Sequence, residues 1–341
     1  MRIGVLTGGG DCPGLNAAIR AIVRYSLSRG SEVVGFLEGW RGVVEGRTRP
    51  IGRDDVQGVL RQGGTILRTS RTNPFRSPET LERMLQTWKD LSLDALIAIG
   101  GEDTLGVTSR LYREYDWPVV GVPKTIDNDL NATDFTFGFD TAVSIATDAI
   151  DRLHTTAESH NRVMVVEVMG RHAGWIAIYS GLAGGADFIA IPEREVTLQE
   201  ICTVVRARAE RGRSFSILVV AEGAKIEGMA TSRTSKADEF GHALLGGIGH
   251  EIALRVEEET GFETRVTVLG HVQRGGTPTA YDRVLATRYG VRACQLVHGG
   301  EFGKMVSLAG NEIVTVDLER AVAEPKTVPA DLASLAQIFF G

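Results

Sequence analysis

The residues best suited to chemistry in this 341-residue chain stand in loops that follow short apolar runs. The run 119–122 leads into a polar loop that contains Lys124, Thr125, Asp127 and Asp129. In extended backbone, residues two apart point to the same side, so the two aspartates can face one substrate. One carboxylate could then accept a hydroxyl proton while the other orients the substrate or a metal shell. Acidic loops are also common as solvated turns, and the adjoining lysine and apolar run favour the catalytic interpretation here.

A glycine-rich segment connects the apolar run 3–6 with a helix-like segment at 15–27. It reads TGGGDCPGLN over residues 7–16. Backbone N–H groups at the amino end of a helix would form an anion site suited to phosphate. The spacing is neither that of a P-loop nor that of the dinucleotide fingerprint. An ordinary tight turn between strand and helix is an equal alternative.

A second segment, residues 98–105, places Glu102 and Asp103 after an apolar run and two glycines. Carboxylates at the carboxyl end of a strand, opposite a phosphate loop, suit Mg²⁺, which prefers a few protein oxygens together with phosphate oxygens. Capping of a helix by Asp103 or Thr104 explains the same residues equally well. A metal site and a helix cap therefore stand as alternatives.

Two further clusters combine arginine, histidine and glycine after apolar runs. They read EVMGRHAGW over residues 167–175 and LGHVQRGG over residues 269–276. Guanidinium forks and imidazole rings suit a bound phosphate. Single histidines are more often structural and surface arginines more often solvated, but two such clusters in an acidic chain favour a phosphorylated substrate.

The apolar runs themselves predict an α/β fold. They alternate with longer amphipathic segments, as parallel strands alternate with helices, and several are apolar throughout, as in a sheet covered on both faces. Residues 15–27 are expected to form a helix. The expected strands are Ile3–Leu6, Val33–Phe36, Ala95–Ile99, Val119–Val122, Val163–Val168, Ile189–Ile191, Ser216–Val220 and Val266–Leu269.

Composition excludes several classes of function. The net charge of −6 opposes nucleic-acid binding, and no apolar stretch is long enough to cross a bilayer, so we expect no membrane partner. Three scattered cysteines suggest neither a disulfide framework nor a zinc site, which favours the cytosol. The polar stretch 229–240 is expected to be a surface loop, and the tail from Asp317 carries no recognisable chemistry.

Taken together and in this order, the motifs GGDCPGLNAAIR, GGEDT, PKTIDND, MGRHAGW and HVQRGG resemble the phosphofructokinase family over about residues 3–300. The resemblance implies an α/β, two-lobed phosphofructokinase fold in which each lobe is a mainly parallel sheet covered by helices. The donor lobe would comprise 1–138 plus 272–302, and the sugar-phosphate lobe 139–271 plus 303–341. A homodimer or homotetramer with sites shared between subunits is also implied.

The resemblance implies roles for individual residues, carried over by matching position. Asp127 would take the proton from the 1-hydroxyl of fructose 6-phosphate, Thr125 and Asp129 would support that hydroxyl, and Glu102 would bind Mg²⁺. The donor phosphates would lie at Gly9, Gly10 and Arg71. The sugar site would consist of Met169, Gly170, Arg171 (which also takes part in catalysis) and Glu222, with the 6-phosphate held by His271, Arg274 and, from a neighbouring subunit, Arg162 and Arg265.

Two residues bear on the phosphoryl donor. Relatives that use ATP resemble one another in carrying Gly after the metal-binding acid and usually at the position of Lys124, where this chain has Asp103 and Lys124. A carboxylate at 103 would oppose the α-phosphate of a nucleotide by bulk and by charge, and an ammonium can stabilise a leaving phosphate. We therefore expect pyrophosphate as donor in a reversible reaction. An ATP-dependent enzyme of the same fold is the alternative, and a non-catalytic sugar-phosphate sensor is a remote one.

A departure from the resemblance concerns regulation. Arg20 and Arg24 match the basic effector site of allosteric relatives, but His154 stands where an arginine is usual and Asp187 replaces a glutamate. The residues 214–216 also lack the expected basic side chains. The chain is therefore expected to be non-allosteric.

Overall fold

The computed structural model describes residues 1–229, 232–237, 240 and 243–341, and of residues 232–237 and 243–245 it describes the backbone. The chain divides into two compact units. Unit 1 comprises Met1–Thr141, Phe240 and Arg274–Pro325, and unit 2 comprises Ala142–Ala237, Ala243–Gln273 and Lys326–Gly341. No helix in the described ranges combines the length and apolar character needed to cross a bilayer.

Unit 1 contains an eight-stranded sheet whose main order is β14-β13-β5-β4-β1-β2-β3, with β6 paired to β5. Its strands are β1 (Arg2–Thr7), β2 (Glu32–Phe36), β3 (Thr48–Pro50), β4 (Ala95–Gly100), β5 (Val119–Thr125), β6 (Phe137–Gly138), β13 (Lys304–Ala309) and β14 (Glu312–Asp317). The central strands are parallel, and β3 and β14 are antiparallel edges. Thr7 is in register with Ile99, and Gly100 with Pro123, so the carboxyl ends of β1, β4 and β5 meet at one edge.

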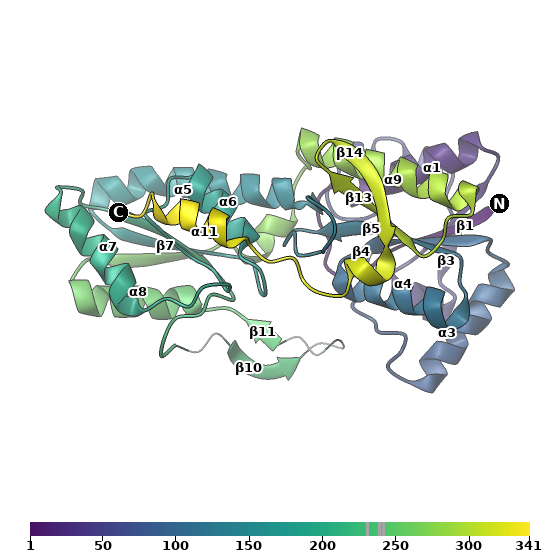
Figure 1. Cartoon of the computed structure of the whole chain (residues 1–341). Helices are drawn as coiled ribbons and strands as arrows, with labels where there is room; N and C mark the ends of the chain where they lie inside the picture. Colours follow the sequence, from purple (N-terminus) through teal and green to yellow (C-terminus); the bar gives the residue numbers. More distant parts are fainter. Residues whose placement is uncertain (230–231, 238–239, 241–242) are drawn as a thin grey trace. The chain divides into compact units, whose positions relative to one another are not determined.

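Helices cover both faces of this sheet (Figure 1). In unit 1 they are α1 (Leu15–Ser28), α2 (Trp40–Glu45), α3 (Pro78–Leu91), α4 (Glu102–Tyr115), α9 (Ala280–Gly299) and α10 (Leu318–Ala321). Helices α1 and α9 pack together on one face, while a cluster that includes Leu6, Leu96 and Ala98 packs with residues of α2, α3 and α4 on the other. Burial of both faces explains why β1, β4 and β5 are apolar almost throughout.

Unit 2 contains a parallel four-stranded sheet in the order β12-β7-β9-β8. Its strands are β7 (Val163–Val168), β8 (Phe188–Ala190), β9 (Ser216–Ala221) and β12 (Thr264–Val268), and β10 (Ser232–Ala237) pairs separately with β11 (Ala243–Leu245). The helices are α5 (Phe139–His160), which begins in unit 1, α6 (Trp175–Ala183), α7 (Leu198–Glu210), α8 (Ile248–Thr260) and α11 (Ala330–Gln337). Helices α7 and α8 bury Ile201, Val205 and Ile252 with side chains of β7 and β9.

The predicted α/β fold is confirmed, and each predicted strand overlaps an observed one. The expected lobe boundary is wrong for 303–325, because β13 pairs with β5 and so joins this segment to unit 1. The predicted loop 229–240 lies partly outside the described residues, and its described backbone includes β10.

Candidate active site

The glycine-rich loop between β1 and α1 is held mainly by the protein itself. The Gly8 amide donates to the carbonyl of Ile99 (2.9 Å) and the Gly9 amide to that of Ser70 (3.2 Å). Gly9 and Gly14 have φ of 75° and 108°, in the left-handed region that favours glycine. Two of the N–H groups in this loop are thus engaged within the protein. The hydrogen bond to Ser70 also brings the exposed Arg71 beside this loop.

Several glycines at this edge make room for protein side chains. A Cβ on Gly8 would lie 2.4 Å from Thr104 Oγ1, and one on Gly100 would lie 2.3 Å from Thr104 Cβ. A Cβ on Gly10 would lie 2.5 Å from Nη1 of Arg274, whose guanidinium also donates to the Asp11 carbonyl (3.3 Å). Close packing around Thr104 and Arg274 therefore explains glycines that the sequence suggested were open to a ligand.

Lys124 brings a cation into this loop. It is the buried next-to-last residue of β5, and its Nζ donates to the carbonyl of Gly10 at 2.5 Å. Burial lowers the pKa of its ammonium, and the charge of Arg274 lowers it further. The side chain can therefore present its N–H groups at the glycine loop, next to the guanidinium of Arg274.

The two aspartates after β5 form a buried carboxylate pair. Oδ1 of Asp127 is buried and has no hydrogen-bond partner in the described part of the chain. The Asp127 amide donates to Oγ1 of Thr125 (3.1 Å), which fixes the turn. Burial, and then the charge of Asp127, raise the pKa of Asp129 to about 7. The pair thus combines an acceptor oxygen that lacks a proton donor with a neighbour that is readily protonated.

The backbone at this pair differs from the extended segment that was predicted. Asn128, between the two aspartates, has φ of 51°, and its carboxamide accepts from the Thr136 amide (3.1 Å) and donates to the Asp134 carbonyl (3.3 Å). Asparagine tolerates this left-handed conformation because its short polar side chain bonds locally. The two carboxylates therefore come together through a turn fixed by Asn128, not through strand alternation.

An Asp129→Asn variant should change how stability depends on pH. Because the pKa of Asp129 is about 7 in the folded state against 3.8 ordinarily, the native chain holds a proton that the unfolded chain loses as the pH rises through this window. The contribution of this group to the free energy of unfolding should fall over the same window. Urea denaturation should show the variant more stable at about pH 8, by at most about 4 kcal/mol, with little difference at about pH 3.5. An equal difference at both pH values, or a similar effect of Asp151→Asn on the exposed face of α5, would contradict the buried pair.

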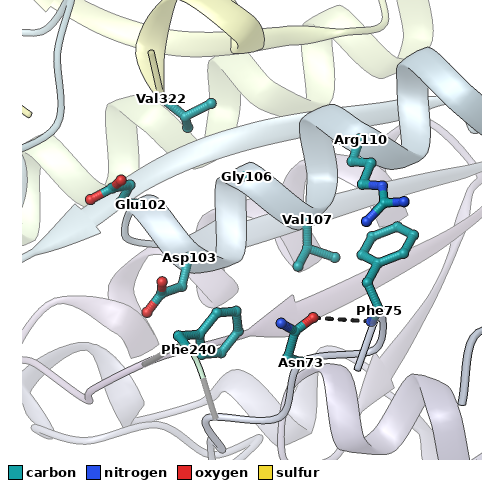
Figure 2. A pocket seen from close by; sticks show the side chains of 9 residues that line it. All are labelled: Asn73, Phe75, Glu102, Asp103, Gly106, Val107, Arg110, Phe240 and Val322. Carbon is teal, nitrogen blue, oxygen red and sulfur yellow. Dashed lines mark hydrogen bonds between the residues drawn. The ribbon is translucent and has the colours of Figure 1, made fainter. Parts of the chain in front are cut away.

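Glu102 and Asp103 begin α4 at the same edge of the sheet. Neither caps the helix, because the capping position is Gly101. Glu102 is exposed, and its charge contributes to raising the pKa of Asp129, so it lies near the carboxylate pair. Asp103 points into a pocket of about 290 Å³ along α4 (Figure 2).

These carboxylates fit the donor set that Mg²⁺ requires. Among the described residues, no group of three His, Cys, Asp or Glu side chains is arranged as a complete metal site. Mg²⁺ is usually bound by one or two carboxylates together with waters and substrate phosphates, so a complete protein cage is not needed. Glu102, an exposed carboxylate at this edge of the sheet, meets this requirement once a phosphate is present.

In unit 2, three predicted sugar-site segments meet at the carboxyl edge of the sheet. The strand β7 leads into Met169, Gly170 and Arg171, and its neighbour β9 leads into Glu222, whose amide donates to the Val168 carbonyl (2.8 Å). The Gly223 amide donates to the Gly170 carbonyl (3.1 Å), and Gly170 has φ of 137°. On the other side of β7, the Leu269 amide donates to the Glu167 carbonyl (3.0 Å), which brings His271 to the same edge. The predicted sugar-binding residues of unit 2 therefore lie together at this edge of its sheet, with the exception of two arginines.

Those two arginines lie at the opposite edge of the sheet. Arg162 precedes β7 and Arg265 is the second residue of β12, and both pair with Glu263. The six residues of β7 span about 20 Å between the two edges. Nε of Arg162 is buried without a hydrogen-bond partner among the described residues. Arg162 and Arg265 therefore do not share an edge with His271 in one chain.

The resemblance predicts that Arg274 holds the 6-phosphate together with His271. Arg274 belongs to unit 1, where its guanidinium lies at the glycine loop, whereas His271 belongs to unit 2. The predicted lobes, divided between residues 271 and 272, likewise place these two residues in different lobes.

Two positioning residues were not predicted as such. Asn16 is buried and joins α1 to the loop 62–66, donating to the carbonyls of Gln62 (3.1 Å) and Gly63 (3.2 Å) and accepting from the Ile66 amide (2.8 Å). The buried Glu167 accepts from the amides at the start of α8, including that of Gly249 (2.8 Å). A polar residue on the buried stripe of a helix, and a charge inside an apolar strand, are the signals that could have found them.

Comparison with known proteins extends the similarity beyond these motifs. The phosphofructokinase family profile matches residues 2–297. The chain is 59% identical to the pyrophosphate–fructose 6-phosphate 1-phosphotransferase of Amycolatopsis mediterranei and 56% identical to the ATP-dependent 6-phosphofructokinase of Mycobacterium leprae, in each case over 100% of both chains. The crystal structure of Pichia pastoris phosphofructokinase in the T-state matches with a TM-score of 0.82 and 33% identity, covering 99% of this chain and 36% of that longer one. The chain belongs to the phosphofructokinase family.

Proposed function

We propose that the chain transfers a phosphoryl group from pyrophosphate to the 1-hydroxyl of fructose 6-phosphate, giving fructose 1,6-bisphosphate and phosphate. The observation that carries this proposal is the buried, unpartnered Oδ1 of Asp127, among the described residues an acceptor that a substrate hydroxyl would satisfy. Lys124 and Arg274 supply cationic groups at the glycine loop of the same unit. The name of the Amycolatopsis relative supports both substrates.

Each group has a definite part in the transfer. Asp127 accepts the proton of the 1-hydroxyl while the oxygen of that hydroxyl forms a bond to the terminal phosphorus of pyrophosphate. The bridging P–O bond of pyrophosphate breaks at the same time and releases phosphate. Thr125 holds the turn that presents this carboxylate, since its hydroxyl accepts from the Asp127 amide. Asp129, with its raised pKa, can be neutral and donate a hydrogen bond. In-line positioning and charge neutralisation supply most of the catalysis in such transfers.

Basic residues receive the charge that develops on the leaving phosphate. Lys124 and Arg274 both lie at Gly10, so a phosphate bound at the glycine loop would meet an ammonium and a guanidinium. Arg71 lies beside the same loop. Mg²⁺ held by Glu102 would neutralise phosphate charge when bound.

The choice of pyrophosphate rests on Asp103. Its carboxylate faces the pocket along α4, where a nucleotide extending past the terminal phosphates would meet negative charge (Figure 2). An ATP-dependent kinase is the second candidate. It is favoured by the aromatic wall of that pocket, where Arg110 lies 4.0 Å over the ring of Phe75, and by the name of the Mycobacterium relative.

The donor assay tests this function. The purified chain with fructose 6-phosphate and Mg²⁺ should form fructose 1,6-bisphosphate with pyrophosphate and little or none with ATP. Comparable rates with both donors would remove Asp103 as a strict filter. Binding of fructose 6-phosphate with no product from either donor would instead indicate a sensor.

The separation of Arg162 and Arg265 from His271 supports a site completed by a second copy of the chain, as a homodimer or homotetramer. Mixing two inactive variants tests this arrangement. Asp127→Ser and Arg162→Ala should each be nearly inactive, and their co-refolded mixture should regain about a quarter of wild-type activity, because half of the pairs are hybrids with one intact site. A mixture as inactive as its parents would place both residues in one chain's site.

The contacts of Asp187 support the absence of effector control. Its carboxylate pairs with Arg208 (2.7 Å) and accepts from the Ile217 amide (2.8 Å), and His154 contacts the Gly184 carbonyl (2.7 Å). Groups already engaged in this way would have to release their partners to bind an effector. Sigmoidal fructose 6-phosphate kinetics relieved by ADP would contradict this proposal.

A further inference from the structure

The pocket along α4 is bounded by a residue from a distant part of the chain. We call it the α4 pocket; it is lined by Asn73, Phe75, Glu102, Asp103, Gly106, Val107, Arg110, Phe240 and Val322 (Figure 2). Eight of these come from the loop before α3, from α4 itself and from the segment after α10. Phe240 comes from the polar stretch 229–240, for which the sequence predicts only a surface loop.

Phe240 is held in unit 1 by apolar packing. It is the one large apolar residue among residues 231–240, which read TSRTSKADEF. Its side chain is half-buried and packs against the core cluster that includes Val107 and Leu105. An aromatic ring in an otherwise polar stretch, buried against the wall of a pocket, indicates a contact specific to that pocket.

We propose that Phe240 is a second determinant of donor choice: its ring and the Asp103 carboxylate together restrict the α4 pocket so that it rejects a nucleotide and leaves the inorganic donor unaffected. This inference rests on the proposed pyrophosphate-dependent function. Figure 2 shows the two side chains next to each other on the same side of the pocket. They act by different means, since Asp103 repels phosphate charge and Phe240 removes volume.

The dimensions of the α4 pocket support a role for Phe240 in limiting its volume. With Phe240 present, the pocket measures about 290 Å³, at the lower limit of the roughly 300–1,000 Å³ typical of small-molecule sites. Truncating the ring would enlarge it on the side that Asp103 also borders. The remaining walls would suit a planar heteroaromatic base, because they consist of Val107 and of the Phe75 ring with Arg110 over it. Pyrophosphate has no group that needs this space.

A double-mutant cycle tests the proposal. Wild type, Asp103→Ala, Phe240→Ala and the double variant would each be assayed with ATP and with pyrophosphate, and the quantity compared is the ratio of kcat/KM for ATP to that for pyrophosphate. This ratio is insensitive to partial unfolding, because both donors report on the same folded fraction. Alanine at 103 keeps the first turn of α4 helical.

We expect Phe240→Ala in the Asp103→Ala background to raise the ratio by about 10-fold or more, the effect typical of opening an apolar pocket by a ring or a few methylenes. Phe339→Ala, at an exposed aromatic of unit 2, should leave the ratio unchanged. If the wild type prefers pyrophosphate and the ratio is the same with and without Phe240, then Phe240 is only an apolar cover and the inference fails alone. A wild type that prefers ATP would overturn both the donor assignment and this inference.

Discussion

An Asp127→Ser variant should transfer phosphoryl groups to fructose 6-phosphate about 10²- to 10⁴-fold more slowly than the wild type. Serine keeps a small polar group at the turn but cannot hold the substrate proton near neutral pH. The loss should appear in kcat, because the groups expected to bind the sugar are unchanged. The unpartnered Oδ1 of Asp127 is the structural reason for expecting an effect of this size.

A stability measurement on Asp127→Ser distinguishes a loss of catalysis from a loss of folded protein. Asp127 raises the pKa of Asp129, so removing its charge should lower that pKa and leave the variant at least as stable as the wild type at neutral pH. Asp151→Asn, at an exposed position of α5, is the matched control and should retain full activity. An Asp127→Ser protein that is folded and turns over at near-normal rate would remove Asp127 as the base.

Lys124→Met should lower kcat with pyrophosphate by about 10²- to 10³-fold, the loss typical of removing one charged donor that stabilises a transition state. Methionine preserves the length of the buried side chain but removes the ammonium that lies at the Gly10 carbonyl. Initial rates at saturating fructose 6-phosphate measure the effect. The same substitution at Lys304, which pairs with Asp317 on the surface, should change little.

A structural role for Lys124 predicts a different pattern. If the ammonium only held the glycine loop through Gly10, Lys124→Met would lower the melting temperature while kcat of the folded fraction stayed near the wild-type value. An Asp103→Asn variant adds a second comparison, because it keeps the bulk at 103 and removes the charge. If Asp103→Asn uses ATP better than the wild type, then Asp103 excludes ATP mainly by its charge. If only Asp103→Ala does so, then Asp103 excludes ATP by its bulk.

The sequence predicted what depends on local pattern. Apolar runs such as 95–99 and 163–168 became strands, because a sheet covered on both faces needs apolar residues throughout. The helix at 15–27 followed from its apolar stripe. Predicted site residues collected at the carboxyl ends of β4, β5, β7 and β9, as expected of parallel sheets.

What could not be predicted depends on contacts between distant segments. Gly8 and Gly100 are glycines because Thr104 fills the space between them, and Gly10 because Arg274 approaches it. The edge strand β14 was missed because a half-exposed antiparallel strand gives a weak pattern, and the pairing of the buried β13 with β5, which was also missed, moved the segment to unit 1. Phe240 was passed over because its polar neighbours predicted only a surface loop.

The reverse reaction tests the central claim, that the donor is pyrophosphate, most directly. The wild-type chain incubated with fructose 1,6-bisphosphate, inorganic phosphate and Mg²⁺ should form pyrophosphate and fructose 6-phosphate, since the leaving phosphate of the forward reaction is then the acceptor. No pyrophosphate under these conditions, together with ATP formation when ADP replaces phosphate, would contradict it.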